Sequence, residues 1–519
     1  MVRQFLTGAA TVALMAIPAP ALAQAMSADE AAALRAELAA LRAQVDALEA
    51  RLGTVTATAP APAPAPAVTP APAPAPAPST ETAWRGAPQF RQGDWSFKPR
   101  GRIHFDAGHV SIPGDLATTR NLGTNLRFRR VRLGAEGTMP GGFGYKLEAD
   151  FAGGNVTLAD AFLSYDVSDS IELRLGNFET LNGMEQISSS NNISFIERAA
   201  FNDAFLNSRR FGAAAAWQTD SLRAEAGLFA AHQLDSSFDN NGYIAAARLA
   251  YTPAIGDGGR LHLAVNAQWR EFASNTGGTP TAGNNTPSQA QLARYRARPG
   301  TQLTDVRFVD TGSFAARRDR IVGLEGAAIL PGFYAAAEAQ WLRASSYRPG
   351  SIATGLNAFP GANTAVVTTN NPQFFGVYGE IGWYITGETR GYRDGTWART
   401  RVLRPVDRGG PGAWMLSARV DHLDLNDAAL VAGATNDFAT GGTSLASITT
   451  RLGRGGTQTG YLLALNWTPI DYIRLMLNYG RIDVEGGPLA GLVRPLATAP
   501  VNERSYSVDL LAARMQLEF

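Results

Sequence analysis

The chain has 519 residues and no cysteine, which excludes disulfide scaffolds, thiolate metal sites and cysteine nucleophiles. Its 46 basic and 45 acidic residues leave a formal charge of +1, and this balance argues against a nucleic-acid-binding protein. All basic residues except Lys98 and Lys146 are arginine. Genome bias and a requirement for guanidinium chemistry are alternative explanations of that excess.

Residues 1–23 have the pattern of a secretory signal peptide. Arg3 supplies the positive charge, residues 5–17 form a short apolar run, and residues 21–23 (Ala-Leu-Ala) form a small-x-small cleavage site. The apolar run is shorter than the roughly 20 residues of a membrane-spanning helix. We therefore expect an exported chain without a helical anchor, which is a periplasmic or secreted protein or an outer-membrane barrel.

Residues 28–53 carry a heptad repeat that predicts a short coiled coil in the periplasm. Its a and d positions are Leu34, Leu38, Leu41, Val45, Leu48 and Leu52. A helix this short needs packing partners, and we therefore expect the chains to associate through it. The alternative is a single helix that packs on its own domain.

Residues 54–94 form the predicted linker. Within it, residues 59–78 are almost entirely alanine and proline, a composition that favours an extended polyproline II spacer. One interpretation is that this spacer lets the coil reach and contact the cell wall.

From residue 95 to residue 519, polar and apolar residues alternate, as expected of strands with one polar and one apolar face. Three features favour a membrane barrel over a soluble sandwich. The apolar face often ends in Trp or Tyr, charged residues occur within the polar face, and the alternation continues to Phe519, the expected assembly signal. We predict an all-β, antiparallel transmembrane β-barrel of about 16 strands, wide enough for a water-filled channel.

Several blocks of this region resemble the porin O/P family, the phosphate-selective porins. They are residues 128–134 (Phe-Arg-Arg-Val-Arg-Leu-Gly), 145–154, 160–165, 194–198, 384–388 and 466–469. The resemblance covers residues 100–519. It implies a homotrimeric, sixteen-stranded porin in the lipid of the bacterial outer membrane, in which the third extracellular loop, here residues 177–209, folds into the lumen and forms the constriction.

The alternation places many arginines on the lumen face, where they would lower the barrier for anions. Their guanidinium groups also suit phosphate oxygens, which they bind two at a time. The predicted anion pathway consists of Arg102, Arg130, Arg132, Arg174, Arg198, Arg209, Arg210, Arg223, Arg248 and Arg270. The alternative is that each arginine pairs with a wall carboxylate and only braces a polar lumen. Arg127 and Arg129 have the opposite parity to Arg130 and Arg132, which indicates a bulge or a strand boundary.

The predicted function is therefore an outer-membrane porin, and not an enzyme, that lets small anions diffuse through an anion-preferring channel, with phosphate or polyphosphate as candidate solutes. We expect no cofactor and no metal. Phosphate-selective members of the family carry lysines near the pore, whereas this barrel offers only Lys98 and Lys146, which supports anion preference more than phosphate selectivity.

Three alternatives to the anion channel stay open: a general porin, a tether to the cell wall, and a barrel enzyme. The nearest catalytic pattern, Asp421-His422, has no evident nucleophile. Conductance would separate a porin from a tether, and hydrolysis of lipid or peptide would separate an enzyme from a porin.

Overall fold

The computed structural model describes residues 80–84, 86–114, 121–205, 208–231, 242–272, 292–312, 314–346, 366–368, 370–432, 455–493 and 500–519, together with five isolated helical residues between Ala39 and Ala47. The chain divides into two units, Met1–Ala77 and Pro78–Phe519. The predicted signal peptide lies outside the described residues, and so do all six a and d residues of the predicted coiled coil. Among the described residues, no helix is long and apolar enough to cross a bilayer.

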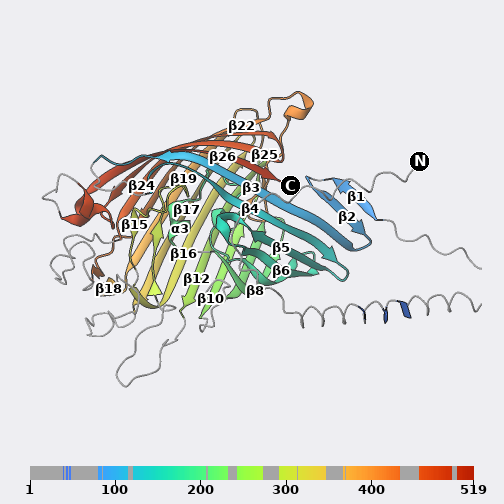
Figure 1. Ribbon diagram of the computed structural model, residues 1–519, viewed down its shortest axis with the longest axis horizontal. Coiled ribbons are helices and arrows are strands. Elements are labelled where there is room, and N and C mark those ends of the chain that lie inside the picture. The colour runs from blue at the N-terminus through green and yellow to red at the C-terminus, as the bar shows by residue number, and fades with distance from the viewer. Residues whose placement is uncertain are drawn as a thin grey trace, which may run out of the picture. The chain divides into compact units, whose positions relative to one another are not determined.

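Sixteen antiparallel strands of the second unit form a closed barrel (Figure 1). Each strand pairs with the next along the chain, and the last strand pairs with the first, where Arg514 lies opposite Asp106. This confirms the predicted all-β barrel. The strands are β3 (Trp95–Val110), β4 (Gly123–Met139), β5 (Phe143–Asp150), β6 (Thr157–Ser168), β7 (Ile171–Glu179), β8 (Arg209–Gln218), β9 (Leu222–Ala230), β10 (Tyr243–Tyr251), β12 (Gly259–Glu271), β16 (Phe314–Leu330), β17 (Phe333–Ser346), β19 (Gln373–Tyr384), β22 (Ala413–Asp424), β24 (Thr457–Ile470), β25 (Ile473–Glu485) and β26 (Ser505–Glu518).

The remaining elements are short. A hairpin of β1 (Glu81–Trp84) and β2 (Pro88–Gln92) continues the sheet beside β3, in a stretch that the sequence analysis assigned to the linker. The other short strands are β11 (Ala254–Ile255), β13 (Leu292–Ala293), β14 (Arg296–Ala297), β15 (Val309–Asp310), β18 (Val366–Thr368), β20 (Tyr392–Arg393), β21 (Thr396–Trp397) and β23 (Leu430–Ala432). Among the described residues from 80 onward, the helices are α2 (Met184–Ile187), α3 (Ala200–Ala204) and the 3-10 turns η1 (Ala152–Gly154), η3 (Val406–Arg408), η4 (Ala490–Leu492) and η5 (Val501–Glu503).

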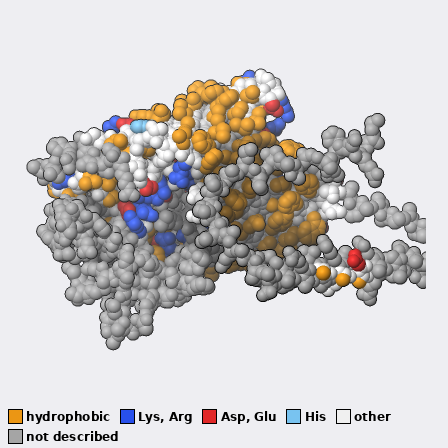
Figure 2. Space-filling view, in the orientation of Figure 1, with side chains coloured by type: hydrophobic (Ala, Val, Ile, Leu, Met, Phe, Trp, Pro, Cys, Tyr) orange, Lys and Arg blue, Asp and Glu red, His pale blue; other side chains and the backbone are white. Residues whose placement is uncertain are grey.

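The outer wall of the barrel is apolar. Figure 2 shows a broad band of hydrophobic side chains on it. Leu263 on β12 is 49% exposed, whereas its neighbour His262 is buried on the lumen side. An apolar band of this kind is stable in lipid and not in water, so the alternation read from the sequence separates a lipid face from a lumen face.

The break in parity near Arg129 is a β-bulge. His104 pairs with Arg130 and Phe105 pairs with Phe128, so Arg129 has no partner residue on β3. The bulge turns both Arg129 and Arg130 away from the lipid, and it confirms the irregularity expected from the sequence.

Part of the lumen is filled by protein. The described residues of the loop 180–208, between β7 and β8, fold inward, and so do residues 292–312, between β12 and β16. Phe201, Tyr295 and Phe308 from these loops are fully buried against inward-facing apolar residues of β16 to β26. This core lies near the strand ends remote from the C-terminus, and it leaves the opposite arc of the wall, β3 to β9, for water.

We expect Leu263→Arg to destabilise the barrel by about 2–4 kcal/mol, because this side chain faces lipid well inside β12. Leu173→Arg should cost less, since Leu173 lies close to the start of β7, where charge is tolerated near the interface. Arg174→Leu, on the lumen face, should fold like the parent. Urea unfolding in lipid vesicles measures all three, and equal stability of Leu263→Arg and the parent would contradict the assigned orientation.

The C-terminal Phe519 exchanges two backbone hydrogen bonds with Gly101 at 3.0 and 3.1 Å. A Cβ atom at Gly101 would collide with the Phe519 ring. We therefore expect deletion of Phe519, or Gly101→Val, to lower the yield of heat-modifiable folded barrel. Gly326→Val is the matched control, because the space around Gly326 is open. If deletion of Phe519 and Gly101→Val both gave a normal yield of folded barrel, Phe519 would be dispensable for assembly.

Candidate ion pathway

A cavity of 790 Å³ lies inside the arc of strands β3 to β9 and reaches the inward loop 180–208. Its basic lining residues are Arg91, Lys98, Arg100, Arg102, Arg130, Arg132, Lys146, Arg174, Arg198, Arg209, Arg223 and Arg393. Its acidic lining residues are Glu136, Asp160, Asp166, Glu172, Glu179, Glu225 and Asp394. The lining is therefore more positive than negative, although the chain as a whole is almost neutral.

Seven of the ten arginines predicted for the anion pathway line this cavity: Arg102, Arg130, Arg132, Arg174, Arg198, Arg209 and Arg223. Arg209 is the first residue of β8 rather than part of the loop. The structure does not bring Arg210, Arg248 and Arg270 to the cavity. Parity alone could not separate the two groups, because it places a residue on the lumen face without showing what covers it.

Arg248 and Arg270 lie away from the cavity, and each forms a buried ion pair. Arg248 Nη2 lies 2.7 Å from Glu325 Oε2 and also donates to Gly395 O at 2.7 Å. Arg270 pairs with Asp319 on the neighbouring strand. Both guanidinium groups are therefore neutralised where they lie, as the bracing alternative predicts.

Several cavity arginines also have carboxylate partners. Arg132 contacts both Glu148 and Asp150 at 2.8 Å. Asp160 lies 2.6 Å from both Lys146 and Arg209. Such pairs hold the polar wall in a fixed shape, and they leave less net charge to act on a passing ion.

Arg130 differs from these residues. It is 5% exposed and forms no ion pair with any residue that the structure describes. Its Nε and Nη1 atoms are buried without an acceptor. A guanidinium group buried without a partner is costly, and an anion at the cavity wall would compensate for it.

Arg198 lines the same cavity from the inward loop. Its Nε donates to Glu185 O at 2.8 Å and its Nη2 donates to Ser188 O at 2.7 Å. These acceptors are neutral carbonyl groups, and Arg198 forms no ion pair with any residue in the described part of the chain.

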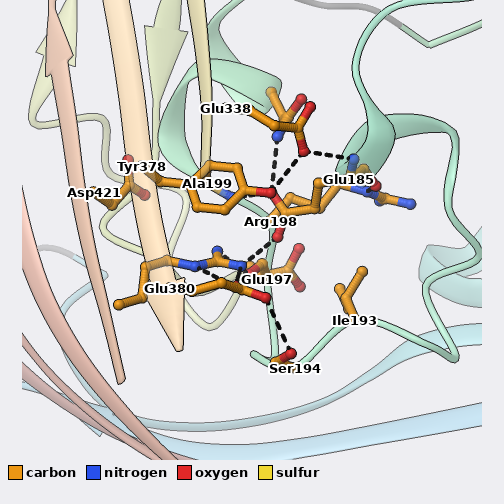
Figure 3. Close-up of polar contacts among 12 residues, drawn as sticks. Glu185, Ile193, Ser194, Glu197, Arg198, Ala199, Glu338, Tyr378, Glu380 and Asp421 are labelled. Carbon is orange, nitrogen blue, oxygen red and sulfur yellow. Dashed lines mark hydrogen bonds and ion pairs between the residues drawn. The ribbon is translucent and has the colours of Figure 1, made fainter. Parts of the chain in front are cut away.

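The inward loop 180–208 is fixed to the wall by charged contacts (Figure 3). Arg419 on β22 contacts both Glu185 and Glu380. Glu185 N donates to Glu338 Oε1 at 2.8 Å, and Tyr378 OH donates to the same oxygen at 2.6 Å. The loop is therefore a fixed part of the lumen surface.

Glu197 connects this loop to strands β4 and β26 of the barrel wall. It lies 2.7 Å from Arg129 Nε and 3.2 Å from Arg514 Nη2. Burial alone would raise the pKa of Glu197, but the two guanidinium groups outweigh burial and lower it. The contact therefore stays charged at neutral pH, and its stabilising effect is lost only as the pH falls through the lowered pKa.

Asp421 belongs to the Asp421-His422 pattern considered as a possible catalytic pair. Its side chain holds the inward loop in place. Its Oδ2 accepts a hydrogen bond from Ala200 N at 2.7 Å. Its neighbour His422 lies on the opposite face of β22 and contacts Thr459. The two side chains do not form a pair, so Asp421-His422 is not a catalytic dyad.

A third inward segment was not predicted from the sequence. The connection between β19 and β22, residues 385–412, carries the β20–β21 hairpin into the lumen. Trp397 N donates to Ser188 Oγ at 2.9 Å, and Tyr392 OH lies 2.6 Å from His262 Nδ1. The tip residues Arg393 and Asp394 line the cavity. The Asp394-Gly395 pair is a hairpin signal that could have revealed this segment.

The loop of residues 292–312 adds arginines that the sequence analysis also missed. Arg298 and Arg307 both pair with Asp203 of the inward loop, at 3.4 and 2.8 Å. Arg294 lies 2.6 Å from Asp310. The alternate arginines at positions 294, 296 and 298 were the available signal, in a stretch too irregular for strand parity to be assigned.

Comparison with known proteins finds relatives of this chain. A protein of Caulobacter vibrioides described as uncharacterized is 36% identical over 449 residues, which are 85% of this chain and 77% of the relative. Porin O of Pseudomonas aeruginosa is 24% identical over 364 residues, 65% of this chain and 75% of the relative.

Among solved structures, an anion-selective porin from Comamonas acidovorans is 11% identical, with 82% of this chain and 100% of that chain covered and a TM-score of 0.44. The outer membrane channel DcaP of Acinetobacter baumannii is 13% identical, with 83% and 99% covered and a TM-score of 0.43. The family model "Phosphate-selective porin O and P" matches residues 97–519. The chain is an outer-membrane porin and belongs to the phosphate-selective porin O and P family.

Proposed function

We propose that this porin conducts small anions in preference to cations, and that phosphate is among its solutes. The observation that carries the proposal is Arg130, a buried guanidinium group at the cavity wall whose Nε and Nη1 atoms have no acceptor. Arg198 supports it, because its positive charge is held by neutral carbonyl groups.

The selectivity has to come from the position of the charges. A formal charge of +1 on the whole chain gives no preference for either sign of ion. In a narrow lumen the effective dielectric constant is lower than in bulk water, so a nearby charge acts more strongly there than on an open surface. Arg130 and Arg198 therefore contribute more than cavity arginines that a carboxylate already neutralises.

Phosphate is the finer part of the proposal. Planar guanidinium groups bind two phosphate oxygens at once, which suits Arg130. The two lysines of the chain, Lys98 and Lys146, also line the cavity. Lys146 is paired with Asp160, so the arginines supply most of the positive charge that is available to bind an anion.

A general porin is the second candidate, and the carboxylate partners of Arg132, Arg174 and Arg223 favour it. If such pairs dominated, the lumen would be polar and braced but would not discriminate between ions.

We extend the proposal to the assembly. The porin is a homotrimer, and its N-terminal segment is an export signal followed by a periplasmic coiled coil, with the linker allowing contact with the cell wall. The heptad spacing of residues 34–52 supports association between chains.

We expect the parent channel to show an anion-type reversal potential in a potassium chloride gradient across a planar bilayer. Arg130→Gln and Arg198→Gln should each move that potential toward zero, because each removes an uncancelled charge beside the pathway. Arg481→Gln is the control, since Arg481 is exposed on the outer face of β25 and its loss changes the total charge equally. Rising salt should reduce the preference, as the screening length falls to about 3 Å at 1 M.

A cation-type reversal potential in the parent would contradict anion preference, and a potential near zero would favour the general porin. An equal shift in Arg481→Gln and Arg130→Gln would show that total charge, and not the cavity, sets the selectivity.

Phosphate recognition is tested by competition. Millimolar phosphate added to a chloride solution should lower the chloride conductance of the parent, because phosphate would occupy the site at Arg130 for longer than chloride. Arg130→Gln should need at least about tenfold more phosphate for the same reduction, since a hydrogen bond to a charged group contributes about 1.5–3 kcal/mol. Sulfate at the same concentration is the control anion, and equal block by both anions would count against phosphate selectivity.

A further inference from the structure

The connection between β19 and β22 has an outward half as well as an inward hairpin. We call residues 399–410 the rim projection. Figure 1 shows it beyond the start of β22, at the end of the barrel where the C-terminus lies. Short turns mark this end as the periplasmic one. Leu403 is 58% and Val406 is 43% exposed on the projection.

The rim projection is held over the outer, lipid-facing side of the wall. Pro411 O, directly after it, accepts hydrogen bonds from Trp467 Nε1 at 2.9 Å and Trp414 Nε1 at 3.2 Å. These two indole rings are stacked with centroids 5.5 Å apart. They share the outward face of their strands with Leu416 and Leu465, both of which are exposed. Outward tryptophans at a strand end mark the headgroup level of the bilayer.

The shape of the projection is fixed by the barrel. Val402 N donates to Asp471 Oδ1 at 2.9 Å, and Gly412 N donates to Arg404 O at 2.9 Å. Arg399, at its base, is paired with Glu518. The exposed side chains are therefore presented on a defined turn.

The projection is basic, and three of its four arginines are unpaired among the described residues. Arg401, Arg404 and Arg408 are exposed and form no ion pair with any residue in the described part of the chain. Asp407 is the one acidic residue in the sequence of the projection. The projection thus has three arginines beside two exposed apolar side chains at headgroup level. This combination matches the surface of a bilayer, where lipid phosphate groups lie next to hydrocarbon chains.

We propose that the rim projection binds anionic phospholipid in the periplasmic leaflet of the outer membrane. Arg401, Arg404 and Arg408 take the headgroup phosphates, and Leu403 and Val406 contact the upper part of the acyl chains. The site lies on the outer side of the wall, so it is independent of the anion pathway inside the lumen.

The test is a titration of the detergent-solubilised full-length protein with short-chain phosphatidylglycerol, followed by native mass spectrometry. Phosphatidylcholine of the same chain length is the neutral comparison. The parent should bind phosphatidylglycerol more tightly than phosphatidylcholine. A triple variant, Arg401→Gln, Arg404→Gln and Arg408→Gln, should lose at least about tenfold in affinity for phosphatidylglycerol, because each basic residue near an anionic surface contributes about fivefold.

The charge-preserving control replaces the same three arginines by lysine, and it should keep most of the preference. Single-channel conductance of the glutamine variant should equal that of the parent, which shows that the variant folds. Equal affinity of the parent for the two lipids, or unchanged phosphatidylglycerol affinity in a conducting glutamine variant, would overturn the lipid assignment. The first result would instead leave a periplasmic protein as the occupant of the projection.

Discussion

The structure depends on one constraint, which is that backbone N–H and C=O groups inside a bilayer have to find their hydrogen-bond partners within the protein. The pairing of β26 with β3 meets it, because it removes the last open edge of the sheet. The seam is reinforced inside the lumen, where Arg514 Nε lies 2.6 Å from Asp106 Oδ1. Arg514 also donates to Ile196 O of the inward loop at 2.7 Å, so closure of the barrel and placement of the loop share one side chain.

Arginine has two different roles inside this barrel. Arg248 and Arg270 are each held by a carboxylate and lie away from the cavity, so they brace the wall. Arg130 has buried donor atoms without an acceptor among the described residues, and a bound anion would offset their cost to the fold. The same residue type thus braces one arc of the wall, whereas on the other arc it carries the anion preference that we propose. The presence or absence of a paired carboxylate decides between these two roles.

Alternation was enough to predict the strands, because a lipid face and a lumen face differ at every second residue. The bulge at Arg129 followed from the same rule, since a parity change needs an extra residue. Two of the three inward segments could not be predicted at all. The β20–β21 hairpin and the loop of residues 292–312 are placed by contacts with residues far away in the chain, such as His262 and Asp203. Parity says which way a side chain points, and it does not say what covers the space in front of it.

The filling of the lumen explains why the cavity lies on one arc. Inward residues of β16 to β26 are often apolar near the strand ends remote from the C-terminus, and there they would be unstable against water. Loops 180–208 and 292–312 supply Phe201 and Tyr295 to cover them, which removes that arc from the aqueous path. In the function that we propose, ions follow the arc of β3 to β9, where many inward residues are charged. An ion crossing there therefore passes the wall that carries Arg130 and the loop that carries Arg198, and the apolar core opposite, by excluding water, strengthens the effect of both charges.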